Sequence, residues 1–409
     1  MPHNKKPIIG LIVPSLILGG GVPSVARFVK DAILRSGRYD LVLISLASSF
    51  RDPCNLCLTK PHTWLRGTST SQDIWDGLPF IHVGATAGEL EYQRYLPRKV
   101  LTKAIADCDI LQVVCGSAAW ANAVCGLGKP VAVQVATRAK IERRLRDANP
   151  KNLSEWWRKA MTLITDRLDD RGLSKVDAIQ VENPWMFEYT KQLNSKRNVD
   201  LRYAPPGIDA KSFHPLPVRS LENDSYILCV GRLSDPRKNI NLLLDAYSIL
   251  PTHIQKKVRL VLAGSSGPTD YFCQRTNEMG LDARINYIAC PTRPELIKLY
   301  QNALLFALPS DEEGLGVVLL EAMGCGIPVV STKSGGPDGI ITDGKDGFLV
   351  ALDDIKGLAN RMEQLCVNIE LNMCMGLQAR QTIEKHYSQE ITAEAFLDMW
   401  DKMLMKKSN

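Results

Sequence analysis

Two glutamates, eight positions apart around a pair of glycines, form the most informative chemical pattern in the sequence. Glu313 precedes Gly314 and Gly316, and Glu321 follows them. The flanking residues predict a strand that ends at about residue 310 and a helix that begins at about residue 317. Backbone amides at such a turn form a cradle for phosphate. A carboxylate only accepts hydrogen bonds, which suits it to the hydroxyls of a sugar or a ribose. Taken alone, the same pattern is more typical of a solvated acidic loop.

Three cations, Arg232, Arg237 and Lys238, follow another predicted strand at residues 226–230 and precede a predicted helix at residues 240–250. An arginine offers a two-pronged fork and a lysine a point charge, which together suit a diphosphate. Such cations stabilise the charge that develops as a bond to phosphate breaks. Cations are unfavourable at the positive end of a helix, so an anionic ligand would relieve the conflict.

Together these motifs resemble the retaining glycosyltransferases of family four, also called glycosyl transferases group 1. The family signature of two glutamates separated by seven residues is matched by Glu313 and Glu321. Its basic strand end is matched by Arg232 and Lys238, and Arg237 competes with Lys238 for the second position. The resemblance is strong over residues 204–350 and weaker elsewhere. Three further stretches carry it: Pro206-Gly207-Ile208-Asp209 with Phe213 and Pro215, where Pro206 replaces the family's Asn; Ser334-Gly335-Gly336-Pro337; and Asp343-Gly344 with Gly347-Phe348.

The resemblance implies roles for individual residues. Arg232, Lys238 and Glu313 would be the catalytic residues, with the two cations on the donor diphosphate and Glu313 on the donor sugar. Glu321 would bind the ribose. The loop at residues 288–294 would lie along the edge of the base. The full set implied for donor binding is Gly20, Gly21, Arg232, Arg237, Lys238, Glu313, Gly314, Leu315, Gly316 and Glu321, with Ile288 and Cys290 at the base.

The same resemblance implies an α/β fold of the GT-B architecture, with two facing Rossmann-like doubly wound parallel-sheet domains and an interdomain cleft. The implied activity is retaining, metal-independent transfer of a hexose from a UDP- or GDP-sugar to an acceptor hydroxyl. The acceptor would be a carbohydrate, a lipid-linked molecule or a small molecule, and no cofactor or metal would be needed. Two alternatives remain open. One is a phosphorylase that uses inorganic phosphate, and the other is a non-catalytic protein that binds a sugar nucleotide or a lipid surface.

One departure from the family pattern concerns the first domain. Many members have a histidine after its fifth strand, but here residues 131–135 are followed by Ala136 and Thr137. Neither His62 nor His82 would replace that histidine unless a loop folded over the cleft. The acceptor side of the reaction is therefore not defined by the sequence.

Two short patterns have the residue types of metal ligands. Cys54 and Cys57 form a CxxC pair with His62 downstream, but a zinc site needs four ligands and no second pair follows. Asp107 and Asp109 flank a cysteine where a helix is expected to pass into a strand. We expect a metal at neither. The eleven cysteines are an odd number and lie mostly in apolar runs, which favours a reducing cytoplasm.

Short β-branched runs alternate with helical stretches along the whole chain, which predicts parallel sheets covered on both faces. With 409 residues the chain is too long for one core, so two domains are expected. We place the acceptor-binding domain at residues 1–205 plus a terminal helix at about 390–409, and the donor-binding domain at residues 206–389. The predicted strands are 8–13, 41–46, 80–83, 110–114, 131–135 and 178–181, then 226–230, 259–263, 284–288, 304–308, 328–331 and 347–350. The first of these is favoured over a signal peptide because Pro14 and a triple glycine interrupt the apolar run.

The charge is mildly positive, with 50 Lys and Arg against 44 Asp and Glu. It is concentrated in residues 138–175, which hold eleven basic and six acidic residues together with Trp156 and Trp157. A basic stretch with tryptophan favours either a solvated helical arm or peripheral contact with an anionic membrane, here at the inner face. We expect no nucleic-acid partner, because the basic residues form no known recognition module.

Overall fold

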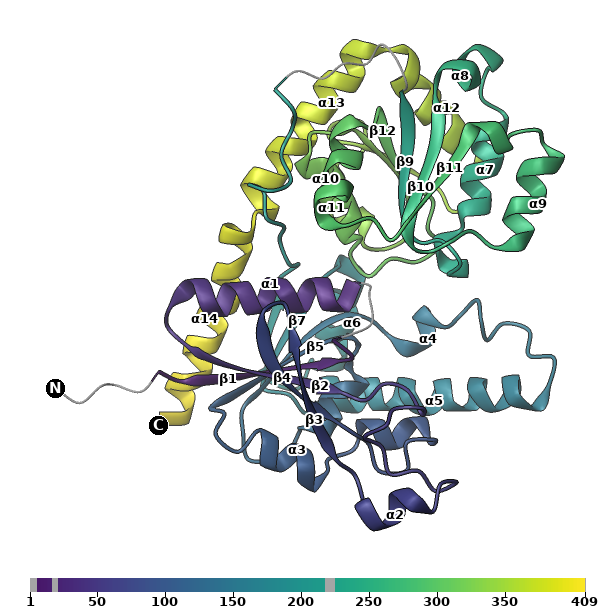
Figure 1. Ribbon diagram of the computed structural model, residues 1–409. Helices are drawn as coiled ribbons and strands as arrows, with labels where there is room; N and C mark the ends of the chain where they lie inside the picture. The colour runs from purple at the N-terminus through teal and green to yellow at the C-terminus, as the bar shows by residue number, and fades with distance from the viewer. Residues whose placement is uncertain (1–5, 17–20, 218–224, 409) are drawn as a thin grey trace. The chain divides into compact units, whose positions relative to one another are not determined.

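The computed structural model describes residues 6–16, 21–217 and 225–408 (Figure 1). The chain divides into two compact units. The first comprises Met1–Pro206 and Thr392–Asn409, and the second comprises Gly207–Ile391. The sequence had placed the two boundaries at 205/206 and 389/390.

The first unit is built on one eight-stranded sheet with the order β3-β4-β2-β1-β5-β6-β7-β8. All neighbouring strands are parallel except β3, which is antiparallel to β4. The six strands predicted for this part of the sequence are present. The strands are β1 (Ile8–Pro14), β2 (Asp40–Leu46), β3 (Thr70–Trp75), β4 (Leu78–Val83), β5 (Ile110–Ser117), β6 (Val131–Thr137), β7 (Ala178–Val181) and β8 (Asp200–Tyr203).

The sequence analysis missed the two edge strands, β3 and β8, because neither has the buried apolar pattern of the central strands. Five of the six residues of β3 are exposed. The turn that joins β3 to β4 could have been recognised from its two residues, Asp76 and Gly77. In the structure these residues adopt φ values of 52° and 78°. Asp-Gly is a preferred pair for a two-residue hairpin turn of this kind.

Helices cover both faces of the first sheet. One face packs against α1 and α14, and the other against α3, α6 and the short turn at residues 118–123. The terminal helix α14 buries Phe396, Met399 and Trp400 completely, and the indole Nε1 of Trp400 donates to the amide oxygen of Gln112 at 2.8 Å. The helices are α1 (Gly21–Ser36), α2 (His62–Arg66), α3 (Lys99–Ala104), α4 (Ala139–Glu142), α5 (Leu153–Leu173), α6 (Pro184–Leu193) and α14 (Gln389–Ser408).

The second unit is built on a six-stranded, wholly parallel sheet with the order β11-β10-β9-β12-β13-β14. All six predicted strands are present, and separate hydrophobic clusters lie on the two faces. Both units thus have the predicted doubly wound α/β organisation. The strands are β9 (Tyr226–Arg232), β10 (Arg259–Ser266), β11 (Ile285–Ala289), β12 (Leu305–Leu308), β13 (Val329–Thr332) and β14 (Phe348–Val350). The helices are α7 (Ile240–Ser248), α8 (Thr252–Lys257), α9 (Asp270–Glu278), α10 (Arg293–Asn302), α11 (Val317–Gly324), α12 (Ile355–Val367) and α13 (Ile369–Thr382).

No helix in residues 6–16, 21–217 or 225–408 combines the length and the apolar character that crossing a bilayer requires.

A buried polar layer lies at the ends of β6 and β7 in the first unit. Gln134 and Gln180 are paired across the two strands, and the amide of Gln134 donates to Glu182 at 3.3 Å and to the carbonyl of Ala204 at 3.2 Å. Glu182 is almost completely buried, and this burial raises its pKa to about 7 although the bond from Gln134 opposes the shift. The folded protein therefore holds the proton of Glu182 more tightly than the unfolded chain does.

This layer predicts a pH-dependent stability. Between about pH 4.5 and pH 7 the folded state binds more protons at Glu182, so the free energy of unfolding falls as the pH rises, and the full cost is present above pH 7. Replacing Glu182→Gln removes the charge and keeps an acceptor for Gln134. We expect the variant to be more stable than the parent by roughly 2–3 kcal/mol at pH 8 and no more stable at pH 4, as measured by urea unfolding. Glu188→Gln, at an exposed position of α6, is the control. Equal effects of the two substitutions would contradict this account.

Candidate functional site

The candidate site of the second unit lies at the carboxyl ends of β9 and β12, which are neighbours in the sheet. β9 is the first strand of this unit and has β10 on one side and β12 on the other, so the strand order reverses here. Ligands of open parallel sheets bind at such a reversal. Arg232 is the last residue of β9, and Arg237 and Lys238 lie in the turn that follows it. The loop after β12 carries Glu313 and the glycine turn.

The main contact between these loops joins Lys238 to Glu313. The ammonium Nζ of Lys238 lies 2.6 Å from Oε1 of Glu313, and the hydroxyl of Ser310 donates to the same oxygen at 2.6 Å. The Glu313 side chain is 9% exposed and that of Lys238 is 17% exposed. Glu313 is thus not the solvated loop residue that its sequence context suggested.

The backbone of the β12 loop is held by the loop that follows β13. The amide of Glu313 donates to the carbonyl of Ser334, and the amide of Gly336 donates to the carbonyl of Glu313, both at 2.9 Å. A Cβ atom at Gly336 would lie 2.4 Å from the carbonyl oxygen of Leu315, so only glycine permits this approach. Gly316, with φ of 86°, then starts α11.

The two arginines differ in how they are bound. Arg237 is bound by two carboxylates, Asp235 at 2.8 Å and Glu312 at 2.9 Å. Arg232 contacts Asp235 at 3.0 Å, and its side chain is 46% exposed. Arg237 therefore braces the two loops, whereas Arg232 retains surface that a ligand can contact.

Glu321 lies in α11, where it is partly buried. The phenol of Tyr300, on the neighbouring helix α10, donates to Oε2 of Glu321 at 2.9 Å. Burial and the adjacent Glu321 hold the pKa of Tyr300 well above its usual value, so the phenol remains a donor at neutral pH. One carboxylate oxygen of Glu321 is in this way fixed by the protein.

The predicted base-edge residues lie at the end of β11, on the same edge of the sheet. Ile288 is partly buried in the strand, whereas Cys290 is exposed with φ of 46°. Tyr287 donates through its hydroxyl to the carbonyl of Gly264 at 3.1 Å and so links this strand end to β10.

The structure gives less information about the two site residues predicted in the first unit, Gly20 and Gly21. Gly20 lies outside the described residues, and Gly21 is the exposed first residue of α1, where an added Cβ would meet no atom within 4 Å. Asp109 accepts from the backbone amide of Ile8 at 3.0 Å, and Cys108 is buried. These contacts give the Asp107–Asp109 segment a structural role at the start of β5.

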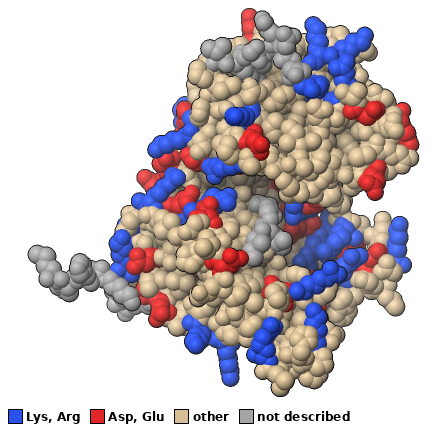
Figure 2. Space-filling model, viewed as in Figure 1, with Lys and Arg blue, Asp and Glu red and all other residues tan. Residues whose placement is uncertain are grey.

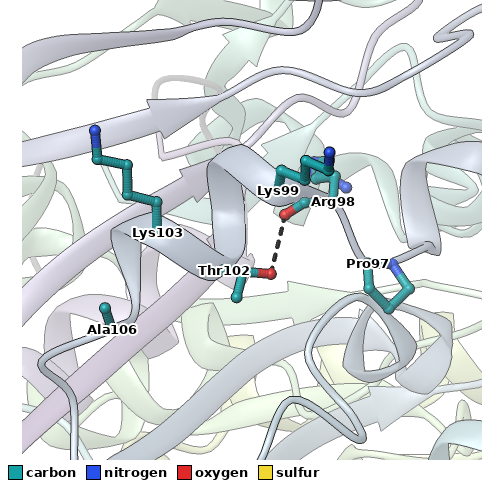
Figure 3. A pocket seen from close by; sticks show the side chains of 6 residues that line it. All are labelled: Pro97, Arg98, Lys99, Thr102, Lys103 and Ala106. Carbon is teal, nitrogen blue, oxygen red and sulfur yellow. Dashed lines mark hydrogen bonds between the residues drawn. The ribbon is translucent and has the colours of Figure 1, made fainter.

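A shallow depression of about 550 Å³ lies on the first unit, around α3 (Figure 3). Figure 3 shows the side chains of Lys99 and Lys103 well apart, so they do not converge on one anion. The hydroxyl of Thr102 is bonded to the backbone carbonyl of Arg98 at 3.3 Å. Because its polar groups do not converge, this depression is not a candidate catalytic site despite its volume.

Sequence reasoning missed the residues that hold the predicted ones in place. Ser310 and Tyr300 bind the two glutamates, and Asp235 and Glu312 bind Arg237. Asp235 had a local signal, because it precedes Pro236 and caps the turn that holds the cations. Tyr300 had none, since it lies 21 positions from Glu321 on another helix.

The buried pair predicts a large stability effect. Lys238→Met leaves the charge of Glu313 buried with one remaining hydroxyl donor, and we expect the free energy of unfolding to fall by about 3 kcal/mol. The double variant Lys238→Met/Glu313→Gln removes both charges and should regain more than half of that loss. Urea unfolding of both variants, with exposed Lys356→Met as the control, provides the measurement. A double variant no more stable than Lys238→Met would show that the pair is not the cause.

Comparison with known proteins gives one family match. Residues 215–382 match the family model described as Glycosyl transferases group 1. A D-inositol 3-phosphate glycosyltransferase of Corynebacterium jeikeium is 30% identical over 218 residues, which are 50% of this chain and 52% of that protein. A probable sucrose-phosphate synthase of Thermosipho melanesiensis is 26% identical over 62% of this chain and 60% of its own length. The chain thus spans about half to three fifths of these curated relatives.

Solved structures resemble the chain over almost its whole length. Sucrose-phosphate synthase from Thermosynechococcus elongatus has a TM-score of 0.71 at 18% identity and covers 98% of this chain and 100% of its own. The Anabaena protein HepE in complex with UDP-glucose has a TM-score of 0.67 at 16% identity and covers 97% of this chain and 99% of its own. At these identities the likeness establishes the fold alone.

Proposed function

We propose that this chain, a GT-B fold that carries a Glycosyl transferases group 1 domain at residues 215–382, is a retaining glycosyltransferase. It transfers a hexose from a UDP- or GDP-sugar to an acceptor hydroxyl, without a metal ion or a cofactor. The observation that carries the proposal is the meeting of Lys238 and Glu313 at the reversal of the strand order, beside the glycine turn that begins α11.

In this proposal the donor diphosphate binds Arg232 and Lys238. Arg232 has exposed surface that a phosphate can contact. Lys238 leaves the carboxylate of Glu313 and pairs with the diphosphate instead. The start of α11 supplies backbone amides on the opposite side. Two fixed cations then stabilise the charge on the leaving diphosphate, which is the task that a metal ion performs in other transferases.

Once Lys238 has turned to the diphosphate, Glu313 accepts hydrogen bonds from the donor sugar. Ser310 still donates to Glu313 and holds its carboxylate in position. Glu321, oriented by Tyr300, accepts from the ribose hydroxyls, and the loop at residues 288–294 lies along the base. Each carboxylate is thus oriented by a hydroxyl donor of the protein, Ser310 for Glu313 and Tyr300 for Glu321.

The chemical step exchanges one bond at the anomeric carbon for another. The bond from this carbon to the diphosphate oxygen breaks, and a bond to the acceptor oxygen forms on the same face, so the configuration is retained. The acceptor proton moves to a donor phosphate oxygen. Glu313 binds the sugar hydroxyls in this scheme and is not the nucleophile, and the hydroxyl of Ser310 keeps its carboxylate in place.

Nucleotide binding tests the donor site. The protein is titrated calorimetrically with UDP, GDP and ADP, with and without EDTA. We expect one of UDP and GDP to bind selectively and without effect of EDTA, and Arg232→Ala to weaken that binding about tenfold to hundredfold, because a charged hydrogen bond contributes about 1.5–3 kcal/mol. Arg232 is preferred to Lys238 for this test because its side chain is 46% exposed and its ion pair with Asp235 spans only three positions of the chain, so Arg232→Ala should leave the fold intact. Lys356→Ala, on the exposed face of α12, is the control.

Failure of all three nucleotides to bind would overturn the transferase proposal and leave a binding protein of another kind. Binding that EDTA abolishes would overturn metal independence. Turnover that requires inorganic phosphate and no acceptor hydroxyl would show a phosphorylase.

We further propose that the first unit contacts an anionic membrane surface through residues 138–175. The first turns of α5 are unusual because their large apolar side chains face solvent: Leu153 is 88% exposed, Trp156 57% and Trp157 54%. The buried residues of the same helix all lie beyond its first two turns: Met161, Thr162, Thr165, Asp169, Gly172 and Leu173. Figure 2 shows Lys and Arg side chains gathered over α4 and α5. Apolar anchors among cations are the pattern of a helix that lies at a lipid surface. A lipid-linked acceptor would be available there.

Vesicle flotation tests this contact. We expect the protein to float with vesicles of mixed neutral and anionic lipid, not with purely neutral vesicles, and less at high salt. Trp156→Ala/Trp157→Ala should reduce the bound fraction at least about tenfold. Trp64→Ala is the matched control, because Trp64 in α2 has the same exposed fraction of 57%. Equal binding to neutral vesicles, or equal loss in the control, would refute the assignment.

A further inference from the structure

Three potential metal ligands meet in the first unit, apart from the donor residues of the second unit. Asp52, Cys54 and His82 each present one ligand atom, and these atoms lie within 4.8 Å of one another. Asp52 and Cys54 belong to the connection between β2 and β3, and His82 lies on β4. Cys54 and His82 are buried, and the side chain of Asp52 is 14% exposed.

This group differs from the one that the sequence spacing suggested. Cys57, the second cysteine of the CxxC pair, is buried elsewhere and directs its sulfur towards the carbonyl of Phe50 at 3.8 Å. His62 is an exposed residue at the start of α2. The fold thus keeps Cys54 from the spacing motif and replaces the other two residues by Asp52 and His82.

The surroundings of His82 fix its ring in the orientation that a ligand needs. Nδ1 lies 3.1 Å from the hydroxyl oxygen of Ser45, which is fully buried and also accepts from the amide of Leu16 at 3.3 Å. Nε2 faces Oδ2 of Asp52 at 2.8 Å. A metal-bound histidine commonly donates its other ring N–H to an oxygen of the protein, as Nδ1 would do to Ser45.

Asp52 is oriented in a similar way. Its Oδ1 accepts from the backbone amide of Cys54 at 3.0 Å, which leaves Oδ2 directed at His82. The thiol of Cys54 has only a weak contact, to the hydroxyl of Ser71 at 3.6 Å. A hydrogen bond between His82 and Asp52 accounts for two members of the group, and the sulfur of Cys54 lies within 4.8 Å of both ligand atoms.

We propose that Asp52 Oδ2, Cys54 Sγ and His82 Nε2 bind one zinc ion, with water as the fourth ligand. A thiolate and an imidazole favour zinc over magnesium or calcium. Two anionic ligands balance the charge of the ion. In a tetrahedral site with bonds of about 2.0 Å to nitrogen and oxygen and about 2.3 Å to sulfur, the ligand atoms are roughly 3.3–3.7 Å apart. Side-chain shifts of about 1 Å or less therefore complete the site.

With three protein ligands and a water, the zinc site would be of the open kind, which keeps one exchangeable position. We assign the ion no part in the transfer step. It would join the long connection between β2 and β3 to β4. Through Ser45 it would also fix the amide of Leu16, where β1 passes into the loop that precedes α1. This inference does not depend on the donor or acceptor of the enzyme.

Metal content of the full-length protein, expressed with added zinc and dialysed against metal-free buffer, tests the site. We expect about one zinc per chain in the parent and in Cys57→Ser, and less than about a tenth of that in Cys54→Ser and His82→Asn. Cys57→Ser is the matched control because it alters the other buried cysteine of the same CxxC pair. With cobalt in place of zinc, the thiolate-to-metal charge-transfer absorption should be present in Cys57→Ser and absent in Cys54→Ser.

The unaltered protein provides a second measurement if a variant fails to fold. Removing zinc with a chelator should lower the thermal midpoint, and adding zinc back should restore it, with UDP and GDP binding followed in parallel. A parent protein with no zinc and no cobalt absorption would overturn the proposal, and so would equal loss of metal in Cys57→Ser and Cys54→Ser. Neither result would affect the donor site.

Discussion

The buried contact between Lys238 and Glu313 is the constraint on which the site of the second unit depends. The two residues are 75 positions apart, and they meet only because β9 and β12 are adjacent and end at the same edge of a parallel sheet. The β12 loop also packs tightly against the loop after β13, where a Cβ atom at Gly336 would lie 2.4 Å from the carbonyl oxygen of Leu315. A shift of either loop would leave a charge buried without its counterion, and such a state is strongly unfavourable. The ion pair therefore fixes the position of both loops.

The same constraint explains why the other charged groups are paired as they are. Arg237 is held by Asp235 and Glu312, so one cation of the cluster is used to join the loops. Arg232 and Lys238 are then presented by a loop that is already ordered, and a ligand does not have to order it. The rearrangement on binding is then confined to the side chain of Lys238, which is favourable because preorganised charges stabilise a developing anion better than mobile ones. Ser310 has the matching task for Glu313, since its hydroxyl stays bonded when Lys238 turns to another anion.

Much of this organisation could be predicted from the sequence, because it depends on local patterns. Apolar runs located the central strands of both sheets, and the glycine turn at 314–316 located the start of α11. The edge strand β3 was missed because its residues are exposed, although Asp76-Gly77 marked the turn that forms it.

Contacts between segments that are far apart in the sequence could not be predicted from local patterns. Tyr300 acts on Glu321 from another helix, and His82 meets Asp52 and Cys54 only because β4 pairs with β2. Spacing alone pointed to Cys57 instead.

The two units hold their first loops by different physical means. In the second unit, charged side chains span the ends of β9 and β12. In the first unit, the end of β1 is held by neutral hydrogen bonds: the amide of Ser15 donates to the carbonyl of Leu46 at 3.1 Å, and that of Leu16 to the hydroxyl of Ser45 at 3.3 Å. Ser45 in turn contacts His82, which ties the start of this loop to the connection between β2 and β3. The anchoring contacts of the two loops thus differ in kind, with ion pairs in the second unit and neutral hydrogen bonds in the first.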